Sequence, residues 1–158
     1  KLEDLVVVAP DVGSAKMARG FGKRLGASFA IIDKRRPSAN MSEVLNVVGD
    51  VEGMNCLLVD DMVDTAGTLS NAVVALKERG AKAVYAAATH ALLSGPAVER
   101  LSDAPLEEMV VTNTIYIPED KRFDNLKILS VGDLLAKAID HVHSSESVSQ
   151  LFEMLPEN

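Results

Sequence analysis

Short apolar runs alternate along the chain with longer stretches of helical periodicity. We expect six of these runs, rich in Val, Ile, Leu and Ala, to be β strands: Leu5–Ala9, Phe29–Ile32, Cys56–Val59, Ala83–Ala88, Met109–Thr112 and Ile128–Val131. Four helices are predicted from the other stretches: Ser14–Leu25, Gly67–Arg79 with Gly80 just beyond its end, a short one near Pro96–Leu101, and Asp133–His141.

The apolar runs are continuous instead of alternating with polar residues, which is typical of strands that are covered on both faces. Strands that alternate with helices along the chain favour the α/β doubly wound class. The pattern therefore predicts a parallel sheet flanked by helices. A length of 158 residues is enough for one domain with a single core.

Charge and composition exclude several classes of function. The formal net charge is −7, which argues against a nucleic-acid-binding surface. The apolar runs are too short to cross a membrane, and we expect no membrane partner. Cys56 is the single cysteine and lies in an apolar run, so we expect a buried, reduced thiol in a cytoplasmic protein. The chain begins with Lys and enters a strand almost at once, which we take as a sign of a fragment of a longer polypeptide.

In folds of this class, ligands bind beyond the carboxyl ends of the strands. Three segments follow predicted strands at that edge, and all the candidate chemistry lies in them: Pro10–Ser14, Lys34–Asn40 and Asp60–Thr68.

The segment Val59–Thr68 (VDDMVDTAGT) predicts a phosphate-binding loop between a strand and a helix. The small residues Ala66 and Gly67 allow backbone N–H groups to approach a phosphate, and Thr65 and Thr68 add hydroxyl donors. The carboxylates before them suit paired sugar hydroxyls or hydrated Mg²⁺. The alternative is that Asp64 or Thr65 only caps the helix, with the preceding aspartates in a solvated turn.

The basic run Lys34-Arg35-Arg36-Pro37 stands out in an acidic chain. Such a run is usually a solvated face. Here it follows a predicted strand on the ligand side, where cations that close over phosphates would stabilise the negative charge of a transition state. Asp11 ends the first strand, and is as plausible for a helix cap as for a ligand when judged from the residues alone.

The string DDMVDTAGT after an apolar strand resembles the phosphoribosyl pyrophosphate (PRPP) loop of type I phosphoribosyltransferases and of ribose-phosphate pyrophosphokinases (PRPP synthetases). Further strings narrow the resemblance to the synthetases and follow that family's order: VVVAPDVG, AIIDKRRPSAN, ATH with SGPA, VVVTNTI and ESVSQLF. The resemblance is to the C-terminal half of a synthetase. It implies that residues 1–158 form one type I phosphoribosyltransferase-like domain whose N-terminal partner half lies outside this chain.

The resemblance also implies roles for individual residues. Binding of the 5-phosphate would fall to Asp64, Thr65, Ala66, Gly67 and Thr68, binding of the ribose hydroxyls to Asp60 and Asp61, and binding of Mg²⁺ to Asp11. Lys34 and Arg36 would act in catalysis, with Asn40 and Arg19 as further substrate-binding residues and Ser147 and Ser149 in an allosteric phosphate or ADP pocket. Two residues depart from the family pattern: Ser14 replaces a usual Gly, and Met17 a frequent Arg.

The implied reaction is pyrophosphoryl transfer from ATP to ribose 5-phosphate, which gives PRPP and AMP. The resemblance implies Mg²⁺ as the cofactor and a homo-oligomer, a hexamer in this family. Because the family's adenine pocket lies in the other half, we expect this chain alone to be inactive. The alternatives are a non-catalytic regulatory subunit, which Ser14 and Met17 favour, a phosphoribosyltransferase, and a nucleotide-fold domain of another use.

Overall fold

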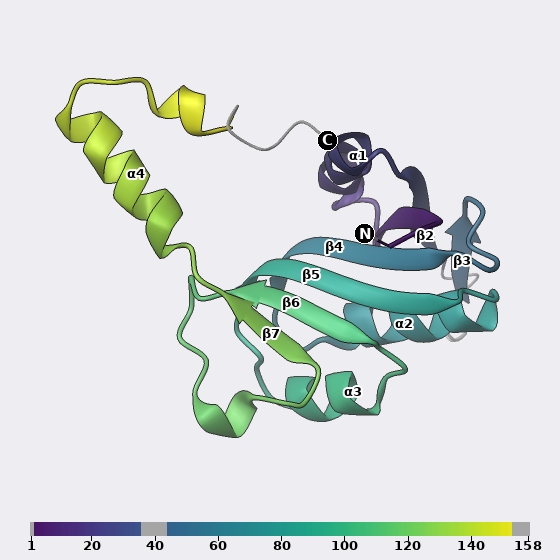
Figure 1. Cartoon of the computed structure of the whole chain (residues 1–158). Helices are drawn as coiled ribbons and strands as arrows, with labels where there is room; N and C mark the ends of the chain where they lie inside the picture. The colour runs from purple at the N-terminus through teal and green to yellow at the C-terminus, as the bar shows by residue number, and fades with distance from the viewer. Residues whose placement is uncertain (1, 36–43, 153–158) are drawn as a thin grey trace.

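A computed structural model describes residues 2–35 and 44–152, with Lys34, Arg35 and Val44 described by their backbone alone. Seven strands form one sheet in the order β3-β2-β1-β4-β5-β6-β7 (Figure 1). The strands are β1 (Leu5–Ala9), β2 (Ser28–Arg35), β3 (Val44–Val48), β4 (Asn55–Val63), β5 (Ala83–Ala91), β6 (Glu108–Thr112) and β7 (Leu126–Leu129). The helices are α1 (Ala15–Leu25), α2 (Gly67–Glu78), α3 (Ala97–Asp103) and α4 (Gly132–His143), with short 3₁₀ helices η1 (Glu119–Lys121) and η2 (Val148–Phe152).

All six predicted strands and all four predicted helices are present, with small shifts at their ends. The expectation of a parallel sheet needs one correction. The strand β3 was missed, and it runs antiparallel to β2, from Ile31 opposite Val48 to Arg35 opposite Val44. Residues 36–43 link the two strands, and this link is too short for the crossover that parallel neighbours require.

Both faces of the sheet are covered around its centre, as the continuous apolar runs predicted. Figure 1 shows α1 on one face and α2 and α3 on the other. Alternate strand residues pack toward α1, and their neighbours pack toward α2 and α3. The first set includes Val7, Ala9 and Val59, with Ala18 of α1. The second includes Val8, Ile32, Cys56 and Leu58, with Leu76 of α2 and Leu101 of α3.

The strand β1 shows why these runs are apolar at every position. Residues Val6 to Ala9 are 0% exposed, although successive side chains point to opposite faces. At about 25 cal/mol per Å² of apolar surface, each fully buried Val or Leu contributes roughly 1.5–3 kcal/mol to stability. The centre of the sheet is therefore the rigid support for whatever follows its strand ends.

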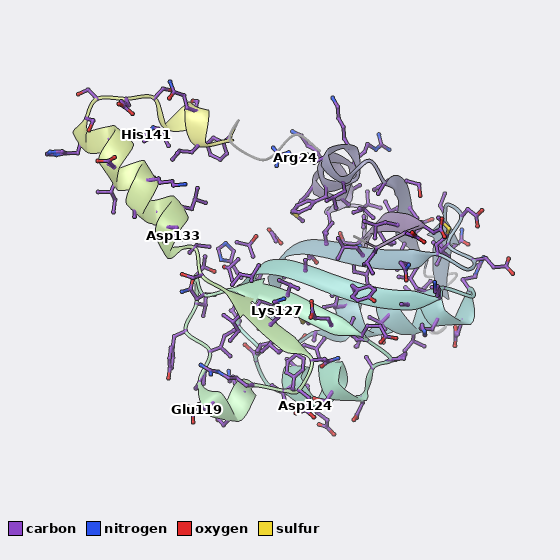
Figure 2. All side chains as sticks on the ribbon, viewed as in Figure 1. Arg24, Glu119, Asp124, Lys127, Asp133 and His141 are labelled. Carbon is purple, nitrogen blue, oxygen red and sulfur yellow. The ribbon has the colours of Figure 1, made fainter. Side chains whose placement is uncertain are left out.

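The helix α4 stands apart from this core. Figure 1 shows it projecting away from the sheet, and Figure 2 shows Asp133 near its start and His141 near its end. None of its residues is buried. His141 folds back on the tail, with Nδ1 3.1 Å from the carbonyl oxygen of Ser147. In the part of the chain that the structure describes, no helix is long and apolar enough to span a membrane.

Candidate active site at the carboxyl ends of β1 and β4

The sheet order places the change of winding direction beside β1. The strand β2 lies on one side of β1 and β4 on the other, both parallel to it. Loops that leave the carboxyl ends of β1 and β4 therefore diverge and leave a crevice between them, which is where doubly wound folds bind ligands. The segments Pro10–Ser14 and Asp60–Thr68, predicted from the sequence, lie at this crevice.

The strand β4 is longer than predicted, so Asp60 and Asp61 lie within it and not in the loop. The ladder between β1 and β4 reaches only Val8 opposite Leu58, whereas β4 remains paired with β5 as far as Val63 opposite Ala91. Continued pairing with β5 is the physical reason for the extra length. On its β1 side, the end of β4 is thus left open to the crevice.

The loop that joins β4 to α2 has the backbone of an anion-binding turn. Ala66, which precedes the first residue of α2, adopts a left-handed conformation with φ 58° and ψ 8°. The residue at the cap position is Ala66, which makes no side-chain cap hydrogen bond. The alternative placed Asp64 or Thr65 at this position, and neither of them occupies it. A left-handed residue followed by a helical turn brings successive N–H groups together, and the helix dipole adds partial positive charge there.

One cavity of about 180 Å³ brings together seven of the predicted site residues. It is lined by Asp11, Asp60, Met62, Val63, Asp64, Thr65, Ala66, Gly67, Thr68 and Leu69. A second cavity of about 450 Å³ adjoins it, because Asp11 and Asp60 line both. The second is also lined by Gly13, Ser14, Met17 and Asp61. Carboxylates line both cavities, and the first also contains the backbone and hydroxyl groups of residues 65–68 that can donate to an anion.

Ser14 connects the two carboxylates of this crevice. Its Oγ lies 2.8 Å from Oδ1 of Asp60 and 3.2 Å from Oδ1 of Asp11, and its backbone N–H also donates to Asp11 Oδ1 at 3.0 Å. The hydroxyl has one hydrogen, which these two acceptors share. The side chain is buried at 7% exposure. A hydroxyl at this position, instead of the expected glycine, holds the end of β1 against the end of β4.

The environment of Asp60 disfavours its charged form. Desolvation on burial raises the pKa of the Asp60 carboxyl above its usual value, and the negative charges of Asp11 and Asp61 raise it further. The hydrogen bonds from the Ser14 hydroxyl and the Asp61 N–H partly oppose this pKa increase. A divalent cation or a hydroxyl donor placed here would relieve the same repulsion.

The donor set fits Mg²⁺ held in an open site. Within the described residues, no group of three or more His, Cys, Asp or Glu side chains forms a metal cage. Magnesium is usually held by one or two carboxylates, with waters and substrate phosphates completing its shell. Asp11 and Asp60 supply that number of carboxylates beside the cavity that would hold a phosphate.

Among the described residues, Arg19, Ser147 and Ser149 line neither cavity. Arg19 stacks on Phe29, with its Cζ 5.1 Å from the ring centroid, and Phe29 is near the start of β2. Ser147 and Ser149 are exposed at the tail beyond α4. The backbone of Lys34 is in β2 opposite Leu45, at the carboxyl end of that strand. Arg36 and Asn40 lie outside the described residues.

The sequence reading missed the contacts behind the loop. Backbone N–H groups of Leu92 and Ser94 donate to the carbonyls of Val63 and Asp64, at 2.9 and 3.0 Å. Arg100 of α3 donates from Nη1 to the carbonyl of Thr65 at 2.9 Å. The only signal in the sequence was the run SGPA, which marked this segment but gave it no role.

With this geometry in view, the comparisons with known proteins are decisive for the family. A family model described as "Phosphoribosyl synthetase-associated domain" matches residues 37–153. The chain belongs to this family. Among similar sequences are the ribose-phosphate pyrophosphokinases of Bacillus subtilis strain 168, 55% identical over 151 residues, and of Caldanaerobacter subterraneus subsp. tengcongensis, 54% identical over 150 residues. These alignments cover 96% and 95% of this chain but 48% of each relative.

The solved structures agree with the family and with the fold. The chain is similar to a phosphoribosylpyrophosphate synthetase from Mycobacterium smegmatis, with a TM-score of 0.84 and 47% identity over 90% of this chain and 46% of the other. An adenine phosphoribosyltransferase, 19% identical with a TM-score of 0.53 over 67% of this chain and 66% of the other, shares the fold. The phosphoribosyltransferase-like fold expected from the sequence is confirmed. The chain spans about half the length of these synthetase relatives.

Proposed function

We propose that this chain is the ribose 5-phosphate-binding and Mg²⁺-binding C-terminal domain of a ribose-phosphate pyrophosphokinase. In the proposed reaction, the 1-hydroxyl oxygen of ribose 5-phosphate attacks the β-phosphorus of ATP. The bond between that phosphorus and the oxygen bridging to the α-phosphate breaks, so that PRPP forms and AMP leaves with the electron pair of the broken bond.

The single observation that carries this proposal is the shared cavity. Residues from the end of β1, the end of β4 and the first turn of α2 line the same space of about 180 Å³. Backbone donors of residues 66–68 suit a phosphate. The carboxylates of Asp60, which lines this cavity, and of Asp61, which lines the adjoining one, suit the vicinal hydroxyls of ribose. An anion site next to paired acceptors matches a sugar phosphate better than it matches either group alone.

The remaining roles follow from position and charge. Asp11, assisted by Asp60, would hold the magnesium ion, which neutralises charge on the phosphates during transfer. Lys34 and Arg36 would lie over the transferring group and stabilise the charge that develops there. Arg19 and Asn40 are further substrate contacts, and Ser147 and Ser149 an allosteric phosphate pocket, on the strength of the family resemblance.

The wider context is proposed on the same basis. The relatives named ribose-phosphate pyrophosphokinase are about twice as long as this chain, which supports a partner half that supplies the adenine pocket. A homo-oligomer, with ATP as the second substrate, and a cytoplasmic location are also proposed.

Calorimetric titration tests this function directly. The chain should bind ribose 5-phosphate more tightly than either ribose or inorganic phosphate, because the cavity accommodates both groups at once. Incubated with ATP and ribose 5-phosphate, it should release no AMP without its partner half. Equal affinity for ribose 5-phosphate and inorganic phosphate would reject the sugar-phosphate assignment.

One observation favours a second candidate, a non-catalytic regulatory subunit. Ser14 occupies an oxygen of both proposed ligand carboxylates, and Met17 places a thioether where the family resemblance leads us to expect a guanidinium. Addition of a synthetase N-terminal half separates the two candidates. Restored turnover of ATP to AMP indicates the enzyme, and assembly without turnover indicates the subunit.

A further inference from the structure

Three successive carbonyl groups, at the end of β4 and the start of the loop that follows it, accept hydrogen bonds from residues that do not line the cavity. The carbonyl of Val63 accepts from Leu92 N–H, that of Asp64 from Ser94 N–H, and that of Thr65 from the Arg100 side chain. The first two donors are backbone groups of the segment after β5. The third donor, Arg100, is a side chain of α3.

The orientation of the Thr65 carbonyl decides which way the next N–H points. The C=O and N–H of one trans peptide point in opposite directions, and the described chain has no cis peptide bond. A Thr65 carbonyl held by Arg100 therefore directs the Ala66 N–H to the opposite side of the loop. Arg100 is not among the residues that line the cavity, whereas Thr65 and Ala66 are. An Ala66 N–H on the side away from Arg100 is free to face the cavity, which Ala66 lines and Arg100 does not.

This turn needs an external support. Ala66 has φ 58°, a conformation that costs a residue with a Cβ about 1–2 kcal/mol. The cap residue of α2 is this same Ala66, which has no side-chain hydrogen bond with which to stabilise the turn. The guanidinium of Arg100 supplies a charge-assisted hydrogen bond in its place.

Gly67 gives independent support for the same contact. Its φ lies outside the left-handed region, so its backbone conformation is open to any residue. A Cβ at Gly67 would, however, lie 3.3 Å from Nη1 of Arg100. The glycine thus makes room for the guanidinium. The loop and α3 meet at this contact.

We propose that Arg100 is a positioning residue for the sugar-phosphate loop, which holds the Ala66 N–H toward the phosphate of ribose 5-phosphate and adds a positive charge behind it. This inference rests on the proposed function and extends it to a residue outside the cavity. The ligand class is a sugar phosphate, and the effect falls on affinity for its phosphate end.

The first test is calorimetric titration of the 158-residue chain with ribose 5-phosphate. Arg100→Met should weaken binding about tenfold, and Arg100→Lys should recover part of the loss because an ammonium can still reach one carbonyl. Arg79→Met is the matched control. Arg79 is another exposed arginine whose Nη2 donates one hydrogen bond, to Asn46 at 3.3 Å, at the far end of α2. It should leave the affinity unchanged.

A double-mutant cycle makes the test specific to the contact. Gly67→Ala should weaken ribose 5-phosphate binding because its Cβ displaces the guanidinium. In the Arg100→Met background the same change should add little. Melting curves accompany each titration, since a purely structural arginine would lower the melting temperature without lowering the affinity of the folded chain.

The outcomes separate the two levels of inference. A wild-type chain that binds no ribose 5-phosphate overturns the proposed function, and with it the role of Arg100. A wild-type chain that binds, with Arg100→Met binding equally well, overturns the role of Arg100 alone. Additive effects of Gly67→Ala and Arg100→Met would also overturn it, because the two residues would then act separately.

Discussion

Ser14 stands where the family resemblance implies a glycine, and its side chain has a visible consequence in the crevice. Its hydroxyl donates into a pair of carboxylates that would otherwise repel each other across the crevice. The same hydroxyl therefore competes with a divalent cation for those oxygens.

We predict that Ser14→Ala lowers the free energy of unfolding by about 1–2 kcal/mol in the absence of divalent cations, because a partly buried charged hydrogen bond is lost. The same change should tighten binding of Mn²⁺, used as a probe for Mg²⁺, since the cation gains two uncompensated carboxylates. Urea titrations and a metal titration by calorimetry measure the two effects. Weaker Mn²⁺ binding in the variant would show that Ser14 supports the metal site instead of competing with it.

Thr68 and Asp64 test the loop itself. We predict that Thr68→Val weakens ribose 5-phosphate binding by about 1.5–3 kcal/mol, the cost of one charge-assisted hydrogen bond. Asp64→Asn should also weaken binding, because it changes the first residue of the loop. Since Ala66 occupies the cap position of α2, neither change replaces the cap residue. A melting point lowered by an amount equivalent to about 1 kcal/mol, with unaltered affinity, would contradict the loop assignment.

The site residues that could be predicted from the sequence were those that form a local motif of recognisable chemistry. Aspartates and a Thr-Ala-Gly-Thr run after a predicted strand indicated residues that line the cavity. Arg100 could not be found in this way, because its partner Thr65 is distant in sequence and is reached only when α3 packs beside α2. The contact of Ser14 with Asp60 likewise depends on the pairing of β1 with β4.

At the scale of elements, the β2–β3 hairpin carries the proposed catalytic residue Lys34 and depends on Gly49. This glycine has φ 122°, and a Cβ there would lie 2.7 Å from the Cβ of the fully buried Ala30. The turn after β3 therefore packs directly onto β2.

We predict that Gly49→Ala lowers the free energy of unfolding by about 2–4 kcal/mol, the sum of backbone strain and a core clash. Gly53→Ala is the control, since Gly53 has φ 71° but nothing within 4 Å of the added Cβ. It should cost only about 1 kcal/mol. Chemical denaturation of both variants separates clash from strain, and equal losses would mean that the contact with Ala30 relaxes.

Elements were predictable wherever burial on both faces produced a continuous apolar run. The strand β3 (VLNVV) has a polar residue at its centre and lies at the sheet edge, so its pattern is weak and it was missed. The length of β4 was underestimated because Asp60 and Asp61 look like the end of a strand, yet β4 pairs with β5 at Asp60 and again at Met62 and Val63. The hydrophobic pattern of one strand does not show how far a neighbouring strand will pair with it.

At the scale of the whole molecule, the core makes stability sensitive to alkaline pH through Cys56. Burial raises the pKa of the Cys56 thiol from 9.0 to about 11, with Lys77 opposing slightly. The folded state thus favours the protonated thiol. Its contribution to stability is fully present below about pH 9 and is lost as the pH rises toward 11.

We predict that the free energy of unfolding of the wild-type chain decreases more steeply between about pH 9 and 11 than that of Cys56→Ala, which has no thiol to ionise. Urea unfolding at intervals across this range measures the difference in slope. The variant should be less stable at neutral pH because of the space it leaves in the core. Parallel pH profiles would mean that the thiol ionises equally well in the folded state.

The position of β1 in the sheet also governs when the protein can fold. Although β1 is the first strand of the chain, it lies between β2 and β4, and the Asn55 side chain donates to the carbonyl of Glu3 at 2.7 Å. Closing so long a loop is entropically costly and makes folding slow. On a ribosome, the emerging β1, α1 and β2 would have one edge of β1 unpaired until β4 had left the exit tunnel. During that interval the open edge of β1 would be able to pair with the strand of another chain.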